Sequence, residues 1–348
     1  MMAASLLGAF YLKKTIPIGQ FQGKVPPSEP YIIGFFVAAG LVVLFFHIFD
    51  MYKLHKERSP LVEAVLVFVL VSAANIILMG VTFLYRGFSF SRLMFSYFWT
   101  LEFLLLGGAR FLFRALWSGG RTRGGLNGRS SDENKTEKGD ISPQNGRKRT
   151  YLLFKRAIDV LFSLGGLFLL SPLFALTGVL IRIGSKGSAL YCHRRVGRGG
   201  KLFYMLKFRS MVSNADKILL ENPSLAKEYK SKFKLQNDPR ITSLGRFLRK
   251  TSLDELPQLI NVVVGDMSIV GPRPVTPEEL EKHSRWSDRL LEMRPGITGM
   301  WQVSGRNALS YSERVKYNVY YARYCSIGLD LKIMFRTLTA VLRFSQTS

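Results

Sequence analysis

Residues 160–181 read VLFSLGGLFLLSPLFALTGVLI, an uncharged apolar run as long as a membrane-crossing helix. Ser171 and Pro172 interrupt this run at its centre, where proline removes a backbone N–H and collides with the preceding turn. Each half is about 11 residues, or roughly 17 Å of helix, which is shorter than a hydrocarbon core of ~30 Å. The run therefore predicts a helix–break–helix that enters one leaflet and returns.

The charges that flank this run support the same interpretation. Basic residues precede it between 148 and 156 and follow it between 182 and 195, so both ends favour the cytoplasm. The Ser171 hydroxyl could bond the backbone groups that the break frees. The alternative is an ordinary span kinked at Pro172, since proline is common in membrane helices.

Three further apolar runs precede the break, at residues 31–49, 64–85 and 93–117. The first two carry no formal charge and the third carries Glu102, Arg110 and Arg114. Their length predicts three transmembrane helices. Basic residues at 53–59 and between 110 and 129 place those segments in the cytoplasm and the N-terminus outside.

Residues 118–149 are rich in Gly, Ser and Asn and almost without apolar residues, which is typical of a flexible linker. The linker separates a transmembrane region, 1–117, from a second part, 150–348, that begins with the re-entrant segment 151–182. Beyond residue 182 the chain is polar and contains mixed α and β patterns. Short strands are expected within 188–197 and 201–211, and helices within 213–221, 224–234, 255–263, 276–286 and 326–345. The last of these suits either an anionic interface or core packing. The fold class is thus a membrane α+β protein.

The composition points to an anionic partner. The chain of 348 residues has 49 Lys+Arg against 24 Asp+Glu, a net charge of +25, and its mean hydropathy is +0.12. Nucleic acid, anionic lipid and phosphorylated substrates would all match this charge, but we find no nucleic-acid-binding motif. Cys192 and Cys325 form no metal or disulfide pattern, the four histidines form no zinc motif, and no cleavable signal peptide is expected.

Two adjacent carboxylates, Asp254 and Glu255, lie in the otherwise cation-rich stretch 251–274, TSLDELPQLINVVVGDMSIVGPRP. A carboxylate set among arginines suits phosphoryl transfer through an aspartyl intermediate. It also suits helix capping, with Asp254 as the N-cap or with Ser252 and Glu255 as a capping box. The two interpretations are compatible, because the positive end of a helix dipole favours an ionised aspartate.

Cations gather around this pair in sequence. Arg246 and Arg249 lie just before it, and Arg273 is stiffened between two prolines, so it could act as a clamp on phosphate oxygens. Lys207 and Arg209 alternate along a strand and should share one face, which suits a diphosphate or a solvated strand edge.

Two glycine-rich segments have open interpretations. Residues 193–201 form a basic turn that suits either an anion site or an ordinary hairpin. Residues 294–307 contain Trp301, which could stack on a nucleotide base or belong to a buried structural loop. Residues 237–240, NDPR, indicate a turn without assigned chemistry.

Four ordered motifs resemble the bacterial sugar transferase family of monotopic polyprenyl-phosphate phosphoglycosyl transferases. They are KRAIDVLFSLGGLFLLSPLFAL, RRVGRGGKLFYMLKFRSM, NDPRITSLGRFLRKTSLDELPQLINVVVGDMSIVGPRP and RPGITGMWQVSGRN, and the resemblance covers residues 150–340. It implies transfer of a sugar 1-phosphate from a UDP-sugar to undecaprenyl phosphate with release of UMP and a requirement for Mg²⁺. It also implies an enzyme of the bacterial inner membrane with a cytoplasmic catalytic domain, acting early in exopolysaccharide, O-antigen or capsule synthesis.

The resemblance also assigns roles to individual residues. Asp254 would be the nucleophile and Glu255 would assist it, and both carboxylates would hold Mg²⁺. Arg273 would bind phosphate, and Ser171–Pro172 would be the re-entrant break. The remaining cations, Lys207, Arg209, Arg246 and Arg249, would line the phosphate-binding site.

The chain departs from long-form members of this family in two ways. In this chain the first span of those members is missing or reduced to residues 4–12. The linker at 118–149 stands in place of their nucleotide-binding-like domain. His193 and the KTSLDELPQL context most resemble galactose phosphotransferases, and the resemblance implies UDP-galactose or UDP-glucose as the donor. Self-association stays open, and a non-catalytic membrane protein that binds anionic lipid is the alternative function.

Overall fold

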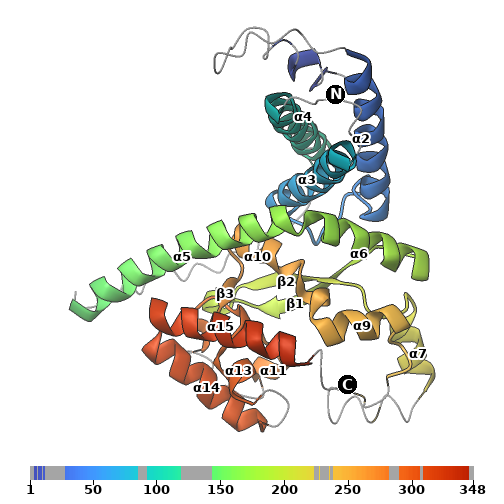
Figure 1. Ribbon diagram of the computed structural model, residues 1–348. Helices are drawn as coiled ribbons and strands as arrows, with labels where there is room; N and C mark the ends of the chain where they lie inside the picture. Colours follow the sequence, from blue (N-terminus) through green and yellow to red (C-terminus); the bar gives the residue numbers. More distant parts are fainter. Residues whose placement is uncertain are drawn as a thin grey trace.

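The computed structural model shows a bundle of helices that stands on a bent helix pair, with a lobe of mixed α and β structure below it (Figure 1). The structure describes residues 28–84, 92–118, 143–222, 238–281, 290–305 and 309–344, with positions 4, 5, 7–9, 11, 227 and 235. The predicted mixed α and β lobe and the predicted helical N-terminal region are both present, and most of the described chain is helical.

The three predicted N-terminal spans are helices: α2 is Ser28–Ile48, α3 is Pro60–Leu84 and α4 is Arg92–Ser118. By length and composition, α3 alone among the described single helices qualifies to cross a membrane, while the apolar part of α2, Ile32–Ile48, is shorter. Two of the charges in α4 are paired, since Arg110 and Arg114 contact the buried Glu63 of α3 at 3.1 and 2.8 Å. Of the region 4–12, the described residues are helical.

The bent pair confirms the predicted break. Helix α5, Pro143–Leu169, and helix α6, Ser171–Gly184, meet at 62° and would together count as a second candidate span. Pro172 lacks the N–H that a continuous helix would donate to the Phe168 carbonyl, and the Ser171 hydroxyl donates to that carbonyl instead, at 2.8 Å. Helix α5 begins inside the predicted linker, whose residues 119–142 lie outside the described chain.

The lobe contains two small sheets. Strands β1, Leu190–Val196, and β2, Leu202–Phe208, form an antiparallel hairpin around a short turn, η1, Arg198–Gly200. The predicted strands and the hairpin interpretation of residues 193–201 are thus confirmed. Strands β3, Ser268–Val270, and β4, Gly296–Thr298, pair in parallel.

The other elements of the lobe are short helices. They are α7 (Ala215–Glu221), α9 (Ser243–Thr251), η2 (Leu253–Glu255), α10 (Gln258–Val264), α11 (Pro277–Glu281), α13 (Met300–Ser304), α14 (Tyr311–Tyr324) and α15 (Ile327–Phe344). Of the predicted helix 224–234, only position 227 is described and helical, and residues 282–286 of the predicted helix 276–286 also lie outside. The C-terminal helix is confirmed.

One hydrophobic core joins the bundle to the lobe. Phe49, which follows α2, is fully buried and stacks on Phe174 of α6 with ring centroids 5.3 Å apart. Phe174 in turn contacts Phe208 of β2 at 4.8 Å. The buried Arg58 donates to the Phe49 carbonyl at 3.1 Å and so holds the loop between α2 and α3. This loop is therefore packed against the lobe.

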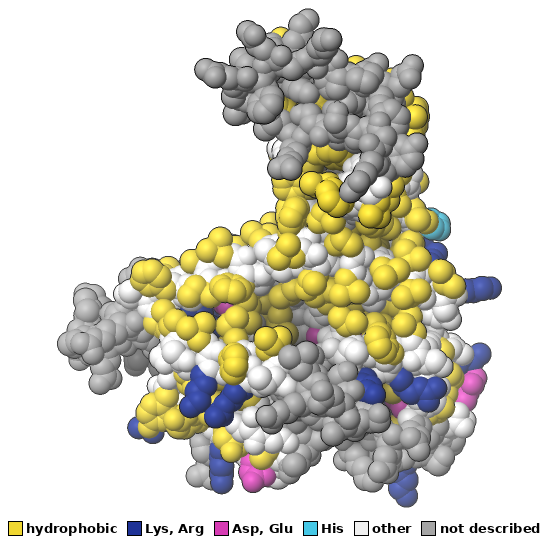
Figure 2. Space-filling model, in the orientation of Figure 1, with side chains coloured by type: hydrophobic (Ala, Val, Ile, Leu, Met, Phe, Trp, Pro, Cys, Tyr) yellow, Lys and Arg dark blue, Asp and Glu magenta, His cyan; other side chains and the backbone are white. Residues whose placement is uncertain are grey.

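Exposed apolar side chains mark the level of the bent pair. Figure 2 shows them on the lower part of the bundle and over the region of α5 and α6, while most Lys and Arg side chains on this face lie below. Large exposed side chains on the pair include Leu161, Phe162, Leu176 and Ile183. Such a surface is typical of contact with lipid or protein.

Gly178 of α6 tests the packing of the loop. A Cβ at this position would lie 2.3 Å from the Phe49 ring, so Gly178→Ala should lower the free energy of unfolding by about 1–3 kcal/mol. The control is Gly165→Ala in α5, where a Cβ would meet nothing within 4 Å. Thermal unfolding of the full chain in detergent measures the difference, and equal midpoints for the two variants would contradict the packing.

Candidate active site

The acid pair lies on the short turn η2 between α9 and α10. Ser252 adopts a left-handed conformation, with φ 59°, which ends α9 and redirects the chain. Asp254 is 8% exposed and Glu255 is half-buried. Neither predicted capping arrangement is present: Ser252 makes no capping hydrogen bond, and α10 begins at Gln258 after Pro257. Both capping interpretations are wrong, because Ser252 is the left-handed C-cap of α9 and Pro257 stands at the N-cap of α10.

Lys207 on β2 faces the acid pair. Its Nζ lies 2.7 Å from Oε1 of Glu255 and 4.0 Å from Oδ2 of Asp254. The cation therefore bonds Glu255 directly and acts on Asp254 through its field. Residues separated by almost fifty positions in the sequence are thus brought together.

Burial changes the acidity of Asp254. Loss of hydration raises its pKa to about 6, and the negative charge of Glu255 acts in the same direction. Lys207 and Arg249 oppose this by favouring the charged form. At pH 7 the carboxylate is therefore mostly ionised but poorly hydrated, which is a favourable state for a nucleophile.

Asn261 joins the acid pair's helix to the strand that carries Lys207. It is fully buried on α10, where Oδ1 accepts from the Leu206 N–H and Nδ2 donates to the Tyr204 carbonyl, both at 2.8 Å. Its amide thus occupies the free edge of β2, next to Lys207. Asn261 was not among the predicted site residues, although an amide inside the apolar run LINVVV is the signal of a buried, fully bonded polar group.

The cations of α9 contribute unequally. Arg249 donates to Oγ of Ser210 at 2.8 Å and lowers the pKa of Asp254, so it lies near the pair. Arg246 is exposed on the same helix, as Arg249 is, so exposure does not separate the two. Arg249 is therefore the better placed of the two to meet a phosphate that reaches Asp254.

Arg209 contacts a different part of the molecule from Lys207. It donates to the carbonyl and hydroxyl oxygens of Ser185, after α6, at 2.9 and 2.8 Å. Strand β2 ends at Phe208, so the alternation that predicted a shared face stops before Arg209. The structure thus uses Arg209 to hold the loop that follows the bent pair.

Arg273 lies over the ring of Trp301. Its guanidinium is 5.2 Å from the ring centroid, and that of Arg314 is 5.0 Å from the same ring. Trp301 is buried, which supports a structural loop over a base-stacking surface. Within the described chain, neither guanidinium forms an ion pair with a carboxylate, so both could meet an external anion.

His193 of β1 borders the site on the same hairpin. Burial and the nearby cations Arg195 and Lys207 lower its pKa to about 4, so it is neutral at pH 7. Its Nδ1 lies 3.2 Å from Nη2 of Arg195. Because arginine can only donate, Nδ1 accepts and Nε2 carries the proton.

The acid pair supplies carboxylate oxygens, which are the ligand type that Mg²⁺ prefers. Mg²⁺ is commonly held by one or two carboxylates that are completed by substrate phosphates and water. Asp254 and Glu255 supply such a donor set from adjacent positions. Within the described residues no group of three or more His, Cys, Asp or Glu side chains forms a cage that would need no substrate.

Comparison with known proteins agrees with this geometry. The family model described as bacterial sugar transferase matches residues 150–344. A second model, described as CoA-binding domain, matches residues 47–137. The described residues of that second range form helices α3 and α4 and the turns before α3, and they contain no strand.

Individual relatives each match more than half of the chain. Exopolysaccharide production protein ExoY of Sinorhizobium fredii is 46% identical over 209 residues, which are 59% of this chain and 90% of that protein. Undecaprenyl-phosphate galactose phosphotransferase of Salmonella typhimurium is 48% identical, over 57% of this chain and 42% of that protein.

UDP-glucose:undecaprenyl-phosphate glucose-1-phosphate transferase of Escherichia coli is 37% identical, over 57% of this chain and 41% of that protein. The chain thus spans less than half of these two longer relatives and nearly all of the shorter one. The family match and the identity to the shorter relative confirm the resemblance seen in the motifs. The chain belongs to the bacterial sugar transferase family.

Proposed function

We propose that this protein transfers a sugar 1-phosphate from a UDP-sugar to undecaprenyl phosphate, as a membrane step of exopolysaccharide, O-antigen or capsule synthesis. The names of the relatives support UDP-galactose or UDP-glucose as the donor. The observation that carries the proposal is the buried carboxylate of Asp254 beside Lys207 and Glu255.

The reaction proceeds in two displacements at one phosphorus. First, an Asp254 carboxylate oxygen bonds the phosphorus that bears the sugar, and the bond from that phosphorus to the UMP oxygen breaks. UMP leaves with the electron pair. Then a phosphate oxygen of undecaprenyl phosphate bonds the same phosphorus and releases the carboxylate. Two steps suit this pair of substrates because one is water-soluble and the other is held in the bilayer.

The cations stabilise the negative charge of the diphosphate. Lys207 holds Glu255 beside the nucleophile, Arg249 lies near it, and Arg273 offers a planar fork to phosphate oxygens. Arg246 is exposed on α9 and would add to the positive charge there, whereas Arg209 holds the loop after the bent pair. Asp254 and Glu255 would hold Mg²⁺, which when bound neutralises charge on the leaving phosphate.

The proposed setting is the cytoplasmic face of the bacterial inner membrane. Residues 1–117 would form the transmembrane region, 118–149 the linker and 150–348 the catalytic domain with its re-entrant segment. Exposed apolar side chains on the bent pair, and Leu331, Phe335 and Leu338 of α15, support contact with lipid. The net charge of +25 suits anionic headgroups.

Exchange of labelled UMP into UDP-galactose, without a lipid acceptor, tests the covalent step. Asp254→Asn should reduce exchange by about a thousandfold or more, because an amide cannot form the intermediate. Its thermal midpoint should not fall, since a buried charge is removed. The matched control is Glu221→Gln on the surface of α7, which should exchange like the unaltered chain. Retained exchange in Asp254→Asn would refute the assignment.

The pH dependence of kcat/KM tests the state of Asp254. Its acid limb should have a midpoint at or below about pH 6, because the protonated carboxyl cannot attack phosphorus and bound Mg²⁺ would favour the charged form further. Lys207→Met should move the midpoint to higher pH and Glu255→Gln to lower pH, since these neighbours shift the pKa of Asp254 in opposite directions. The residual activity of the variants suffices for this measurement. An acid-limb midpoint that is unchanged in both variants would contradict the effect of these charges on Asp254.

A further inference from the structure

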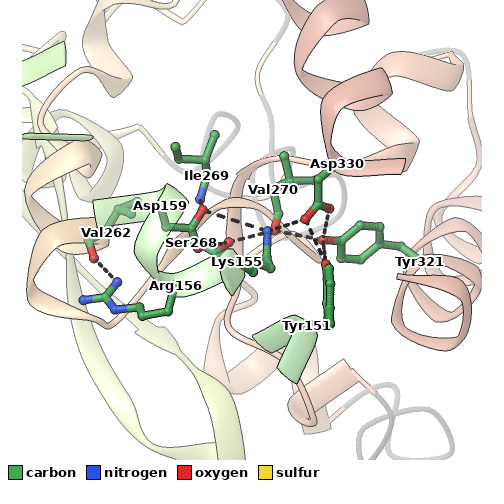
Figure 3. Close-up of polar contacts among 10 residues, drawn as sticks. All are labelled: Tyr151, Lys155, Arg156, Asp159, Val262, Ser268, Ile269, Val270, Tyr321 and Asp330. Carbon is green, nitrogen blue, oxygen red and sulfur yellow. Dashed lines mark hydrogen bonds and ion pairs between the residues drawn. The ribbon is translucent and has the colours of Figure 1, made fainter. Parts of the chain in front are cut away.

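A buried polar network lies apart from the acid pair and joins four elements of the lobe (Figure 3). Its charged members are Lys155 and Asp159 of α5 and Asp330 of α15, each at most 7% exposed. Tyr321 of α14 and Ser268 of β3 are 1% exposed and complete it. Buried ion networks are costly to desolvate and are often no better for stability than apolar packing. We therefore expect this network to have a role besides stability.

Asp330 fastens α5 to the two C-terminal helices. It accepts from Lys155 Nζ at 2.9 Å, from the Tyr321 hydroxyl at 2.5 Å and from the Tyr151 hydroxyl at 2.8 Å. Its carboxylate is thus well supplied with donors, two of them from α5. These three bonds do not themselves reach β3, although the Tyr321 hydroxyl also lies 3.2 Å from the Val270 carbonyl of that strand.

Asp159 fastens the same helix to β3. It accepts from Oγ of Ser268 at 2.7 Å and from the Ile269 N–H at 3.1 Å (Figure 3). The opposite edge of β3 is paired with the β4 segment, where the Ser268 N–H donates to the Pro295 carbonyl at 2.9 Å. Asp159 therefore occupies the strand edge that no strand covers.

The chain from β3 to Arg273 has little freedom. A Cβ at Gly271 would lie 2.5 Å from the Arg294 carbonyl oxygen, so the backbone is tightly enclosed there. Pro272 follows with a restricted φ, and its carbonyl accepts from the Gly296 N–H at 2.8 Å. A displacement of β3 would therefore be passed on to Arg273.

The same turn of α5 also holds the acid pair's helix. Arg156 donates to the carbonyls of Val262 and Val263, at the end of α10, at 2.5 and 2.8 Å. Helix α10 follows Asp254 and Glu255 directly. Within one helical turn, Arg156 thus binds the element after the acid pair and Asp159 binds the strand before Arg273.

We propose that Asp159 is a positioning residue that acts through β3 to place Arg273 relative to the acid pair. Helix α5 continues into the break at Ser171. It would therefore connect the apolar, membrane-facing segment to the distance between Arg273 and the acid pair. This inference rests on the proposed phosphate-binding role of Arg273.

A double-mutant cycle between Asp159 and Arg273 tests the proposal, with kcat and KM measured for UDP-galactose and undecaprenyl phosphate in detergent. Asp159→Ala should raise KM for UDP-galactose about 10-fold. In an Arg273→Ala background the same change should alter KM by less than about twofold, because its effect passes through the missing side chain. Asp159→Asn keeps an acceptor for the Ile269 N–H and should restore most of the loss.

The matched control is Tyr151→Phe, which removes one hydrogen bond to Asp330 in the same network without touching β3. It should lower the thermal midpoint and leave KM unchanged. If Asp159→Ala does not fold, Ser268→Ala replaces it in the cycle, since it removes the shorter bond to Asp159. Equal effects of the Asp159 change in both backgrounds, or an effect on stability alone, would overturn the proposal.

Failure of the proposed function gives a different result. If Arg273→Ala itself leaves KM unchanged, the phosphate role of Arg273 is wrong and this inference falls with it. If exchange of UMP persists in Asp254→Asn, the covalent mechanism is wrong whatever the cycle shows. Additivity in the cycle, with both of those assignments intact, rejects only the positioning role of Asp159.

Discussion

The catalytic lobe depends on keeping one carboxylate, that of Asp254, out of water and beside a cation from a distant element. Burial alone would favour the neutral acid, and Lys207 limits that tendency by its charge. The position of Lys207 is fixed in turn by Asn261, whose amide binds the free edge of β2. The acid pair, the hairpin and α10 thus form one unit. Asn261 of α10 holds β2, and Lys207 of β2 contacts the acid pair.

The bent helix pair connects this unit to an apolar surface. Its break is stabilised by a single local exchange, in which the Ser171 hydroxyl replaces the N–H that Pro172 lacks. The first helix of the pair has two functions along its length. Its polar turns bind β3, α10 and α15, while its later turns expose large apolar side chains such as Leu161 and Phe162. One helix therefore belongs both to the core of the lobe and to the surface that would meet lipid.

Much of this arrangement is predictable from local patterns. The break follows from the missing N–H of proline, and the hairpin follows from strand patterns on either side of a glycine-rich turn. The acid pair stands out by composition, and all three signals lie within a few residues. The partners of buried polar groups are not predictable in this way. Asp159 meets Ser268, and Asn261 meets Tyr204, across long stretches of sequence that no periodicity connects. The role of Ser252 was predicted wrongly for a related reason, because the capping pattern does not reveal that this residue ends the preceding helix in a left-handed conformation.

Mass spectrometry of the protein after incubation with UDP-galactose and no lipid acceptor tests the central claim most directly. The account predicts a peptide that contains residue 254 with the mass of a hexose phosphate added to Asp254. The addition should disappear when undecaprenyl phosphate is supplied, as the sugar phosphate passes to the lipid. An unmodified Asp254 in a preparation that still makes the glycolipid and releases UMP would contradict the account.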